Sequence, residues 1–482
     1  MQNKKIGIKS ATKWSIISEV VAKIVGPITT MILARVIDIK SFGILASITM
    51  IVSFADNIIN IGFQRVLIQI NLDEEEIMDY CNVCFWCNFI LSLFCWLLLI
   101  YYSKSIVMLL GIEGKELEII IAGLVLPISA FSTIQEGLYI KELNFKILFY
   151  NRLISVFIPL LITLPIAFLT KNYWALLAGN ISLIVVKSIY LTFVSPWKPA
   201  FHFSVNILKL IYKLTIANML DALVYWLASW VDIFFISKLF GTYYSGLYKT
   251  SQTLVTSIIS LLTAGLVSVA FSSLSLYRND NEKFTEIFLT FQKGVSILAI
   301  PLGVGMYLYK ELIVKLLLGD KWLMTSEFVG IWGFIITLIS VYGTFSSEAY
   351  RAIKKPKISL CVQLVNLIFT LFICVIFSSL TYEKFVIVRS FSFLQIILLH
   401  GFFMKKLFNI SLKKMLENTI YPIISSIIMG IVCIFLKIYF KSTEMQIISI
   451  IISIIVYFSI ILLNYEYRII IFSFIKKYKK RS

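Results

Sequence analysis

The sequence predicts an all-α integral membrane protein with about 14 transmembrane helices, arranged as two six-helix bundles followed by two C-terminal helices. Of its 482 residues 59% are hydrophobic and 15% are charged, and the mean hydropathy is +0.91. A water-soluble chain of this size is far less apolar. Apolar runs of roughly 20 residues, long enough as helices to cross the hydrocarbon core of a membrane, recur along the whole chain. The alternating segments of a β-barrel do not occur in it.

The apolar runs fall into two similar sets with a polar connection between them. The first set predicts spans at approximately 14–35, 41–63, 80–102, 117–135, 147–169 and 173–195. The second set predicts spans at 211–236, 243–270, 286–309, 325–347, 358–379, 385–404, 418–439 and 443–466. The chain therefore divides into a first bundle (1–195), a cytoplasmic linker (196–210), a second bundle (211–407) and an appended pair of helices with a basic tail (408–482). Two short apolar pieces, 106–110 and 312–318, are expected to be surface helices.

Basic residues are concentrated in alternate connections. With the amino terminus inside, more than twice as many Lys and Arg residues lie in the inner connections as in the outer ones, and the chain ends in IKKYKKRS. This is the positive-inside pattern and predicts that both termini face the cytoplasm. It also accounts for the net charge of +18 without nucleic acid as a partner. The first span lacks a small-residue cleavage site, so we expect an uncleaved span rather than a signal peptide.

The two halves share a weak internal repeat. Without a gap, Phe42-Gly43-Ile44 matches Ser245-Gly246-Leu247 at an offset of 203 residues, and Ala34-Arg35-Val36 matches Ser237-Lys238-Leu239. In both copies an apolar helix ends at a cation and a glycine opens the next helix. Half-chain repeats are typical of membrane transporters, whose binding site lies where the repeats meet.

Charged residues inside the predicted spans are the main functional candidates, because a charge at the centre of a membrane helix is costly and usually faces a cavity or a partner. The cations would attract an anionic substrate: Lys23, Lys187, Lys249, Lys293 and Arg389. The carboxylates are candidates for coupling to an ion gradient: Asp56, Asp221, Asp232 and Glu19. Local explanations remain open. Lys187 and Lys293 lie near a membrane surface and can snorkel. Other pairings are also open: Glu19 with Lys23, Asp232 with Lys238 or Arg35, and Lys249 with Asp232 or Asp221.

Aromatic residues and prolines supply further candidates. Trp226 and Trp230 offer ring faces on which sugars could stack, although aromatic residues also form belts at membrane interfaces. Pro27 and Pro301 interrupt spans and are candidate hinges, with ordinary packing as the alternative.

Chemistry other than transport has little support in the sequence. The run Cys81-x-x-Cys84-x-x-Cys87 has metal-ligand spacing, but it opens an apolar span without a histidine nearby, so we interpret these residues as structural thiols. No catalytic residue, metal site or cofactor is predicted. No nucleotide-binding loop is present, so pumping by ATP would need a partner subunit.

Four segments resemble the polysaccharide (Wzx-type, lipid-linked oligosaccharide) flippase branch of the multidrug/oligosaccharidyl-lipid/polysaccharide exporter superfamily. These segments are ILARVIDIKSFG, KELNFK, VDIFFISKLFGTYYSGLY and LLLGDKW. The turn that the family usually writes with Gly-Pro is Asp38-Ile39 here.

The resemblance implies alternating-access movement of an undecaprenyl-diphosphate-linked oligosaccharide across the bacterial cytoplasmic (inner) membrane. The oligosaccharide would be a repeat unit of O-antigen, capsule or exopolysaccharide, with a glycan polymerase, export machinery and membrane lipids as partners. It also implies that Lys23 and Lys249 engage the diphosphate. A drug or organic-cation exporter of the same superfamily is the alternative, although its cavity would favour carboxylates. A membrane glycosyltransferase or polymerase is a third reading, disfavoured by the short outer connections.

Overall fold

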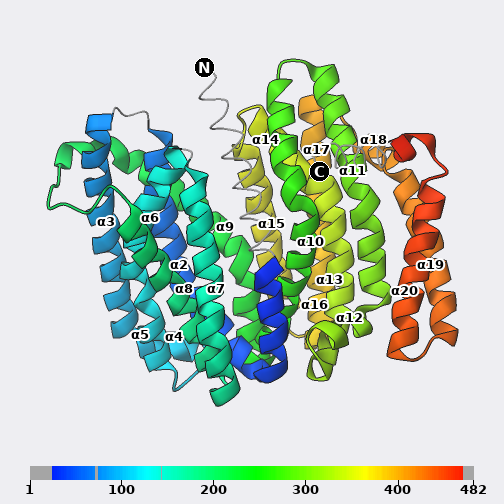
Figure 1. Cartoon of the computed structure of the whole chain (residues 1–482), viewed down its shortest axis with the longest axis horizontal. Helices are drawn as coiled ribbons and strands as arrows, with labels where there is room; N and C mark the ends of the chain where they lie inside the picture. The colour runs from blue at the N-terminus through cyan, green and yellow to red at the C-terminus, as the bar shows by residue number, and fades with distance from the viewer. Residues whose placement is uncertain (1–23, 71–73, 143, 470–482) are drawn as a thin grey trace. The chain divides into compact units, whose positions relative to one another are not determined.

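The computed structural model describes residues 24–70, 74–142 and 144–469. Within these ranges every regular element is a helix, which confirms the predicted all-α class (Figure 1). The chain forms two compact units, Met1–Thr250 and Ser251–Ser482. They are called unit 1 and unit 2 below, and α10 (Thr242–Leu276) begins in the first and continues in the second.

Unit 1 begins, in its described part, with a short helix, Ile24–Val36. Its other helices are α2 (Ile39–Gln69), α3 (Glu74–Tyr101), α4 (Ser103–Leu110), α5 (Glu116–Gly123), α6 (Val125–Lys141), α7 (Phe145–Thr170), α8 (Tyr173–Val194) and α9 (Val205–Phe240). Within this unit α2 packs against α6 and α9, and α7 packs against α8.

Unit 2 continues from α10 into the helices of the second half. They are α11 (Asn281–Leu308), α12 (Lys310–Leu317), η1 (Asp320–Thr325), α13 (Ser326–Ile339), η2 (Ser340–Thr344), α14 (Phe345–Ala352), α15 (Lys357–Ile376), α16 (Tyr382–Ser392), α17 (Leu394–Phe408), α18 (Leu412–Glu417), α19 (Ile420–Tyr439) and α20 (Thr443–Ile461). Here α11 packs against α13 on one side and α19 on another, and α19 pairs with α20.

The number of membrane-length helices agrees with the prediction of about 14. Twelve helices within the described residues are long and apolar enough to cross a membrane. The helix Ile24–Val36 and the 35-residue α10 occupy two further predicted spans. The short pieces α4 and α12 are separate helices, as expected, and each lies at the lower end of its own unit in Figure 1. The division into two six-helix bundles with a linker at 196–210 stays a prediction.

The turn before α2 explains the departure from Gly-Pro. Asp38 is the N-cap of α2, where its side chain accepts hydrogen bonds from the Ser41 amide (3.0 Å) and the Ser41 hydroxyl (2.6 Å). Aspartate is among the best N-cap residues because it satisfies amides that have no partner in the first turn. Asp38 therefore caps the start of α2 in a turn that contains no proline.

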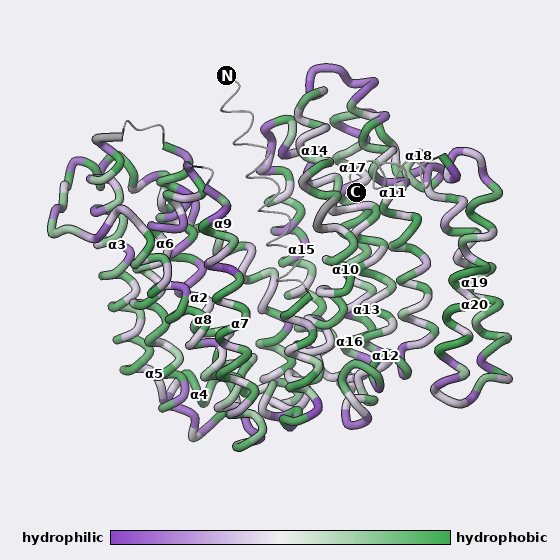
Figure 2. The backbone as a smooth tube through the Cα atoms, viewed as in Figure 1, coloured by the Kyte–Doolittle hydropathy of each residue, from purple (hydrophilic) through white to green (hydrophobic). Residues whose placement is uncertain are grey.

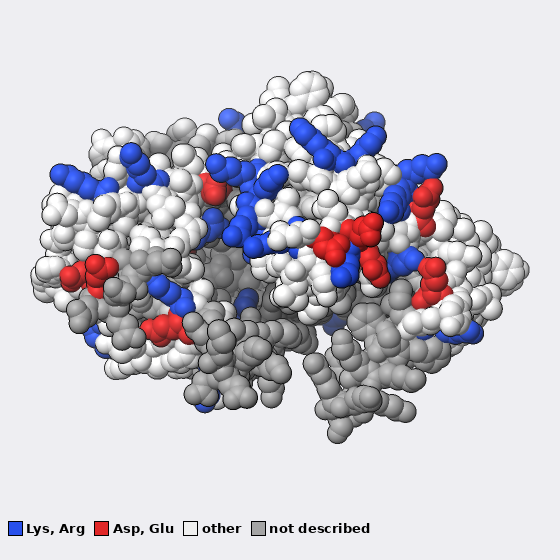
Figure 3. Space-filling model, turned by 90° about the horizontal axis from the view of Figure 1, so that it is seen from above, with Lys and Arg blue, Asp and Glu red and all other residues white. Residues whose placement is uncertain are grey.

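Hydrophobic residues cover most of the length of the helices, and hydrophilic residues gather at the helix ends and in the connections (Figure 2). Seen from above, one face of the chain carries many Lys and Arg side chains and fewer Asp and Glu side chains (Figure 3). This accords with the concentration of basic residues in alternate connections that the sequence shows.

Candidate functional site

The candidate site lies in unit 1, where polar side chains interrupt the apolar faces of α2 and α9 and the start of α10. Three features make it up. The first is a hydrogen-bond network of neutral side chains around the Asp56 carboxylate. The second is the pair of tryptophans Trp226 and Trp230 on α9, and the third is Lys249 of α10, which lies against Trp230. We call this group the α2–α9–α10 site.

Asp56 is held by neutral polar groups from two helices. Its Oδ1 accepts hydrogen bonds from the Asn60 amide (2.8 Å) on α2 and from the Ser129 hydroxyl (2.6 Å) on α6. Asn60 continues the network, because its Oδ1 accepts from Thr133 (2.7 Å) and Asn88 (3.0 Å). A carboxylate in a membrane-length helix thus has fixed donors around it, which lowers the cost of removing its charge from water.

Asp56 also lines a small cavity of about 190 Å³. The cavity lies among α2, the α5–α6 segment and α8, and its polar lining consists of Thr49, Ser53, Asp56 and Asn180. Hydroxyl, amide and carboxylate oxygens are ligands that suit a proton or a hard monovalent cation. The geometry is therefore compatible with the predicted role of Asp56 in ion coupling, which stays a prediction.

Trp226 of α9 is hydrogen-bonded to Ser53, one of the residues that line the cavity. Its indole Nε1 donates to the Ser53 hydroxyl (3.0 Å), and its ring meets Phe54 edge-on at a centroid distance of 4.9 Å. Because Trp226 is engaged on α2 through both its N–H and its ring, its orientation is fixed. A ring fixed in this way can present a face to a ligand at little entropic cost.

One turn further along α9, Trp230 carries a cation. The Lys249 ammonium lies 4.1 Å from the centroid of the Trp230 ring, which is cation–π geometry. The buried Asp232 carboxylate, which accepts a hydrogen bond from the Tyr248 hydroxyl (3.0 Å), is close enough to act electrostatically on Lys249. The ammonium therefore has an aromatic face and a nearby negative charge inside unit 1.

The remaining predicted cations are each engaged elsewhere or lie outside the described residues. Lys187 pairs with Glu136 of α6 (2.5 Å), and Lys293 pairs with Glu466 (2.5 Å). Arg389 is fully buried in unit 2, where it lies 3.8 Å from the Phe393 ring centroid and donates to Ser392 (2.6 Å). Lys23 and Glu19 fall outside the described residues. Their proposed contacts with substrate or ions remain predictions.

The other predicted residues are distributed over both units. Asp221 is half-buried on α9, three turns from Asp232. Pro27 lies in the helix Ile24–Val36 of unit 1, and Pro301 lies inside α11 of unit 2. The Cys81 and Cys84 thiols are buried in the apolar core of unit 1, and Cys81, Cys84, Cys87 and Cys95 are free thiols. No group of three or more metal-ligating side chains was found among the residues that the structure describes.

Sequence reasoning missed the neutral members of the Asp56 network. Asn60, Asn88, Ser129 and Thr133 are uncharged, so a search for charges inside spans passes over them. A signal was present, however. Asp56 and Asn60, Asn88 and Ser92, and Ser129 and Thr133 are three polar pairs spaced four residues apart, each on one face of an apolar helix.

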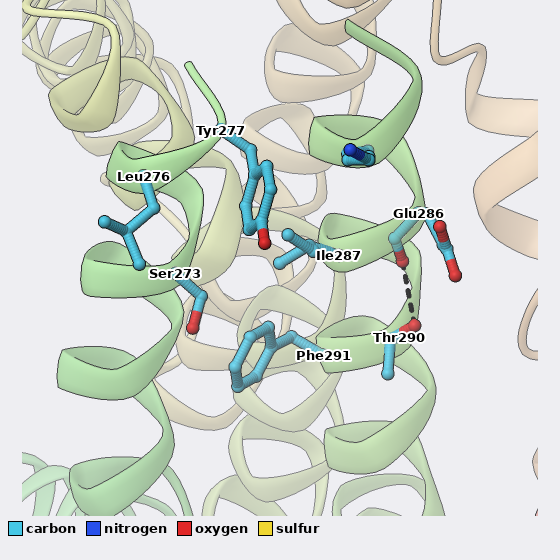
Figure 4. Close-up of a pocket in the computed structure, with 8 residues that line it drawn as sticks. Ser273, Leu276, Tyr277, Glu286, Ile287, Thr290 and Phe291 are labelled. Carbon is cyan, nitrogen blue, oxygen red and sulfur yellow. Dashed lines mark hydrogen bonds between the residues drawn. The ribbon is translucent and has the colours of Figure 1, made fainter. Parts of the chain in front are cut away.

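A separate pocket of about 350 Å³ lies in unit 2 at the turn between α10 and α11. Tyr277, which directly follows the last residue of α10, and Ile287 and Phe291 of α11 line it, and the Thr290 hydroxyl donates to the Glu286 carbonyl (2.8 Å) (Figure 4). None of the predicted site residues lines this pocket. It is therefore distinct from the α2–α9–α10 site.

The family profile described as "Polysaccharide biosynthesis protein" matches residues 32–327. The chain belongs to this family. The match contains α2, α9 and α10, and hence all three helices of the α2–α9–α10 site. The resemblance inferred from the four sequence segments is thereby confirmed.

Relatives of this polysaccharide biosynthesis family are similar over about two thirds of the chain. An uncharacterized membrane protein in the cps region of Klebsiella pneumoniae is 23% identical over 325 residues, which are 66% of this chain and 66% of that protein. The succinoglycan biosynthesis transport protein ExoT of Rhizobium meliloti is 21% identical, over 70% of this chain and 69% of that protein. The lipopolysaccharide biosynthesis protein WzxC of Escherichia coli is 22% identical, over 65% and 63% respectively.

Solved structures show the same fold at low sequence identity. The lipid II flippase MurJ in an inward closed conformation aligns with a TM-score of 0.77 and 16% identity, over 95% of this chain and 99% of that chain. An inward-facing multidrug resistance MATE family transporter of the MOP superfamily aligns with a TM-score of 0.62 and 13% identity, over 83% and 94% respectively. This polysaccharide biosynthesis family member therefore has a fold found in both flippases and drug exporters.

Proposed function

We propose that this chain is a flippase, not an enzyme, for an undecaprenyl-diphosphate-linked oligosaccharide. It would carry a repeat unit of O-antigen, capsule or exopolysaccharide across the bacterial inner membrane by alternating access, with both termini in the cytoplasm. Family membership supports this proposal, as do relatives whose names refer to succinoglycan transport and to teichuronic acid and lipopolysaccharide biosynthesis. A glycan polymerase and export machinery would act on the product.

The observation that carries the proposal is the Lys249 ammonium at 4.1 Å from the Trp230 ring. A cation held in an apolar segment attracts anions strongly, since few waters compete for it. Lysine binds phosphate as a point charge, and an indole ring offers an apolar face on which a sugar can stack. We assign the diphosphate to Lys249 and the first sugars to Trp230 and Trp226.

Energy would come from an ion gradient acting through Asp56, whose mainly apolar cavity also holds the side-chain oxygens of Thr49, Ser53 and Asn180. Asp221, Asp232 and Glu19 are the further candidates for this role. Asp56 has the strongest support among them, because it combines a fixed carboxylate with space beside it.

Reconstitution tests the proposal directly. The purified chain would be placed in liposomes that contain an undecaprenyl-diphosphate-linked oligosaccharide, and an impermeant glycosidase would report the fraction of glycan exposed outside. We expect exposure to rise with the amount of protein until the inner pool is depleted. An unchanged exposure relative to protein-free liposomes would contradict the proposal.

The same liposomes separate the proposal from drug export. A cationic dye that drug exporters carry should not move, because a site with Lys249 at its aromatic group repels cations. Protein-dependent dye transport without glycan exposure would favour the exporter reading.

A further inference from the structure

Helix α11 of unit 2 has a break in its backbone hydrogen bonding at Pro301. Proline has no N–H, so residue 301 cannot donate to the carbonyl of Ile297, its partner in a regular α-helix. A carbonyl left without a donor inside a membrane protein is costly, because no water is available to replace the lost bond. The residue that donates to the Ile297 carbonyl in place of residue 301 therefore stabilises α11 at the break.

The replacement donor is the hydroxyl of Tyr457 on α20. It donates to the Ile297 carbonyl at 2.7 Å, and the Tyr457 side chain is 1% exposed. A tyrosine hydroxyl that is buried this deeply needs an acceptor of its own. The Tyr457 hydroxyl and the Ile297 carbonyl thus satisfy each other's hydrogen-bonding need. The appended helix pair α19–α20 supplies the donor that the proline lacks.

Among the C-terminal residues that the structure describes, Tyr457 is one of three donors to the backbone of α11. Asn418 donates to the Leu289 carbonyl (2.9 Å), and Lys437 donates to the Leu308 carbonyl (2.8 Å) at the other end of the helix. We call Asn418, Lys437 and Tyr457 the C-terminal brace. Its contacts lie at Leu289, at the break and at the last residue of α11, so they extend over the C-terminal two thirds of the helix.

The two sides of α11 next to the break are packed differently. At Gly303 a Cβ atom would lie only 2.1 Å from the Thr337 hydroxyl of α13, so this side is in tight contact. At Gly305 nothing lies within 4 Å of such an atom, and both Pro301 and Gly305 line an apolar cavity of about 440 Å³ that is also lined by α19 and α20. Space for a change in the direction of the helix is therefore present on the side of the cavity and absent on the side of α13.

We propose that the C-terminal brace sets the bend of α11, and that Tyr457 is its positioning residue because it closes the hydrogen-bond gap at Pro301. In this view α19 and α20 are a working part of the transport mechanism and do more than extend the membrane domain. The first part of the proposal concerns structure alone and goes beyond the proposed flippase function. The second part, the effect on transport, rests on that function.

A double-mutant cycle between residues 457 and 301 tests the structural part. In the wild-type background, Tyr457→Phe leaves the Ile297 carbonyl without a donor and should lower the apparent melting temperature of the purified protein by about 2–4 °C. In a Pro301→Ala background the alanine amide can donate to Ile297, so Tyr457→Phe should cause no fall. An equal fall in both backgrounds, or no fall in either, would overturn the proposal.

Tyr309→Phe is the matched control. The Tyr309 hydroxyl is hydrogen-bonded to Ser449 of α20 (2.7 Å), so its loss also removes a buried contact with α20, but this contact does not involve the proline gap. Its effect on the melting temperature should be the same with proline and with alanine at position 301. Coupling of Tyr309 to position 301 as strong as that of Tyr457 would show that the cycle reports general packing, and would count against the brace.

Glycan exposure in liposomes tests the transport part. Tyr457→Phe should slow exposure by roughly two- to tenfold, the range that one neutral hydrogen bond can supply, at equal incorporation. The double variant Tyr457→Phe/Pro301→Ala should expose glycan no more slowly than Pro301→Ala alone. Normal transport by Tyr457→Phe would overturn this part. Failure of the wild-type chain to expose glycan would instead contradict the flippase function, and it would leave the melting-temperature cycle as the measure of the brace.

Discussion

Gly43 and Gly246 lie in backbone contact within unit 1. They are equivalent positions of the internal repeat, 203 residues apart. A Cβ atom on Gly43 would lie 1.7 Å from the Thr242 carbonyl oxygen, and one on Gly246 would lie 2.3 Å from the Ile39 carbonyl oxygen and 2.9 Å from the Gly43 amide nitrogen. The first turns of α2 and α10 therefore approach as closely as only glycine permits. The two copies of the repeated motif meet at their glycines.

This contact predicts that alanine is not tolerated at either position. Gly43→Ala and Gly246→Ala would each force two backbones apart, and overpacking of this kind typically destabilises by about 1–3 kcal/mol. We expect less monodisperse protein in detergent extracts and a lower melting temperature for both variants. The amount of monodisperse protein and the melting temperature would both be measured by size-exclusion chromatography of a fluorescent fusion.

Gly294→Ala is the control for these variants. Gly294 lies inside α11, and nothing lies within 4 Å of a Cβ atom placed on it. Because alanine is a better helix former than glycine, this change should leave stability unchanged or raise it slightly. If Gly43→Ala behaved like Gly294→Ala, close backbone packing of the repeat would not matter for stability.

Much of the fold could be predicted because each membrane span is specified locally. Roughly 20 apolar residues define a helix whatever its neighbours are, and the positive residues between spans set its direction. For this reason the predicted spans and the short helices α4 and α12 agree with the structure. The break at Pro301 was also visible in the sequence. Its hydrogen-bond partner on α20 was not, because that contact joins residues 160 apart.

The candidate site could be predicted only in part, because the sequence does not specify which side chains meet. Charge inside a span drew attention to Lys187, Lys293 and Lys249, and only their distance from the membrane surface separated the first two from the third. The structure separates them, since Lys187 and Lys293 have carboxylate partners on other elements and Lys249 lies against Trp230. These partners are between 19 and 173 residues away along the chain, so helical spacing could not identify them.

The two ion pairs should differ in their contribution to stability. Lys187 and Glu136 are each 27% exposed, whereas Glu466 is 68% exposed. Glu136→Gln leaves a half-buried ammonium without its counter-charge and should lower stability by about 1–3 kcal/mol. Glu466→Gln should change it by less than about 1 kcal/mol, as is usual for surface pairs. Thermal unfolding of both variants beside the wild type would measure the difference, and equal losses would contradict it.

The Lys293–Glu466 pair should also respond to pH in a defined direction. The hydrogen bond from Lys293 lowers the pKa of the Glu466 carboxyl. The ion pair therefore contributes fully to stability above the unfolded-state glutamate pKa of about 4.3. This contribution is lost as the pH falls through the lower pKa of Glu466 in the folded protein. The small difference between wild type and Glu466→Gln should vanish in acid. A difference that grew as the pH fell would contradict this assignment.

The Asp56 network predicts a separation between folding and coupling. Asn60 connects Asp56 to Asn88 and Thr133, so Asn60→Ala should leave several buried groups without partners and reduce the amount of folded protein, by about 1–3 kcal/mol for each such group. Asp56→Asn keeps the shape and much of the hydrogen bonding but removes the charge. It should fold normally and lose the dependence of glycan exposure on an imposed ion gradient. Gradient-dependent exposure by Asp56→Asn would remove Asp56 from the coupling role.

Lys249 offers the sharpest test of the substrate site, because its two roles predict different results for the same substitutions. If it holds the diphosphate, Lys249→Ala should abolish glycan exposure while the protein accumulates normally, and Lys249→Arg should retain part of the activity, because a cation remains over Trp230. If instead it neutralises Asp232, Lys249→Ala should reduce the amount of folded protein, and Asp232→Asn in the same chain should restore both folding and transport. Recovery of transport in that double mutant would exclude Lys249 as an indispensable phosphate ligand. We expect no recovery, since Asp232 also accepts from Tyr248 and the diphosphate would still lack its cation.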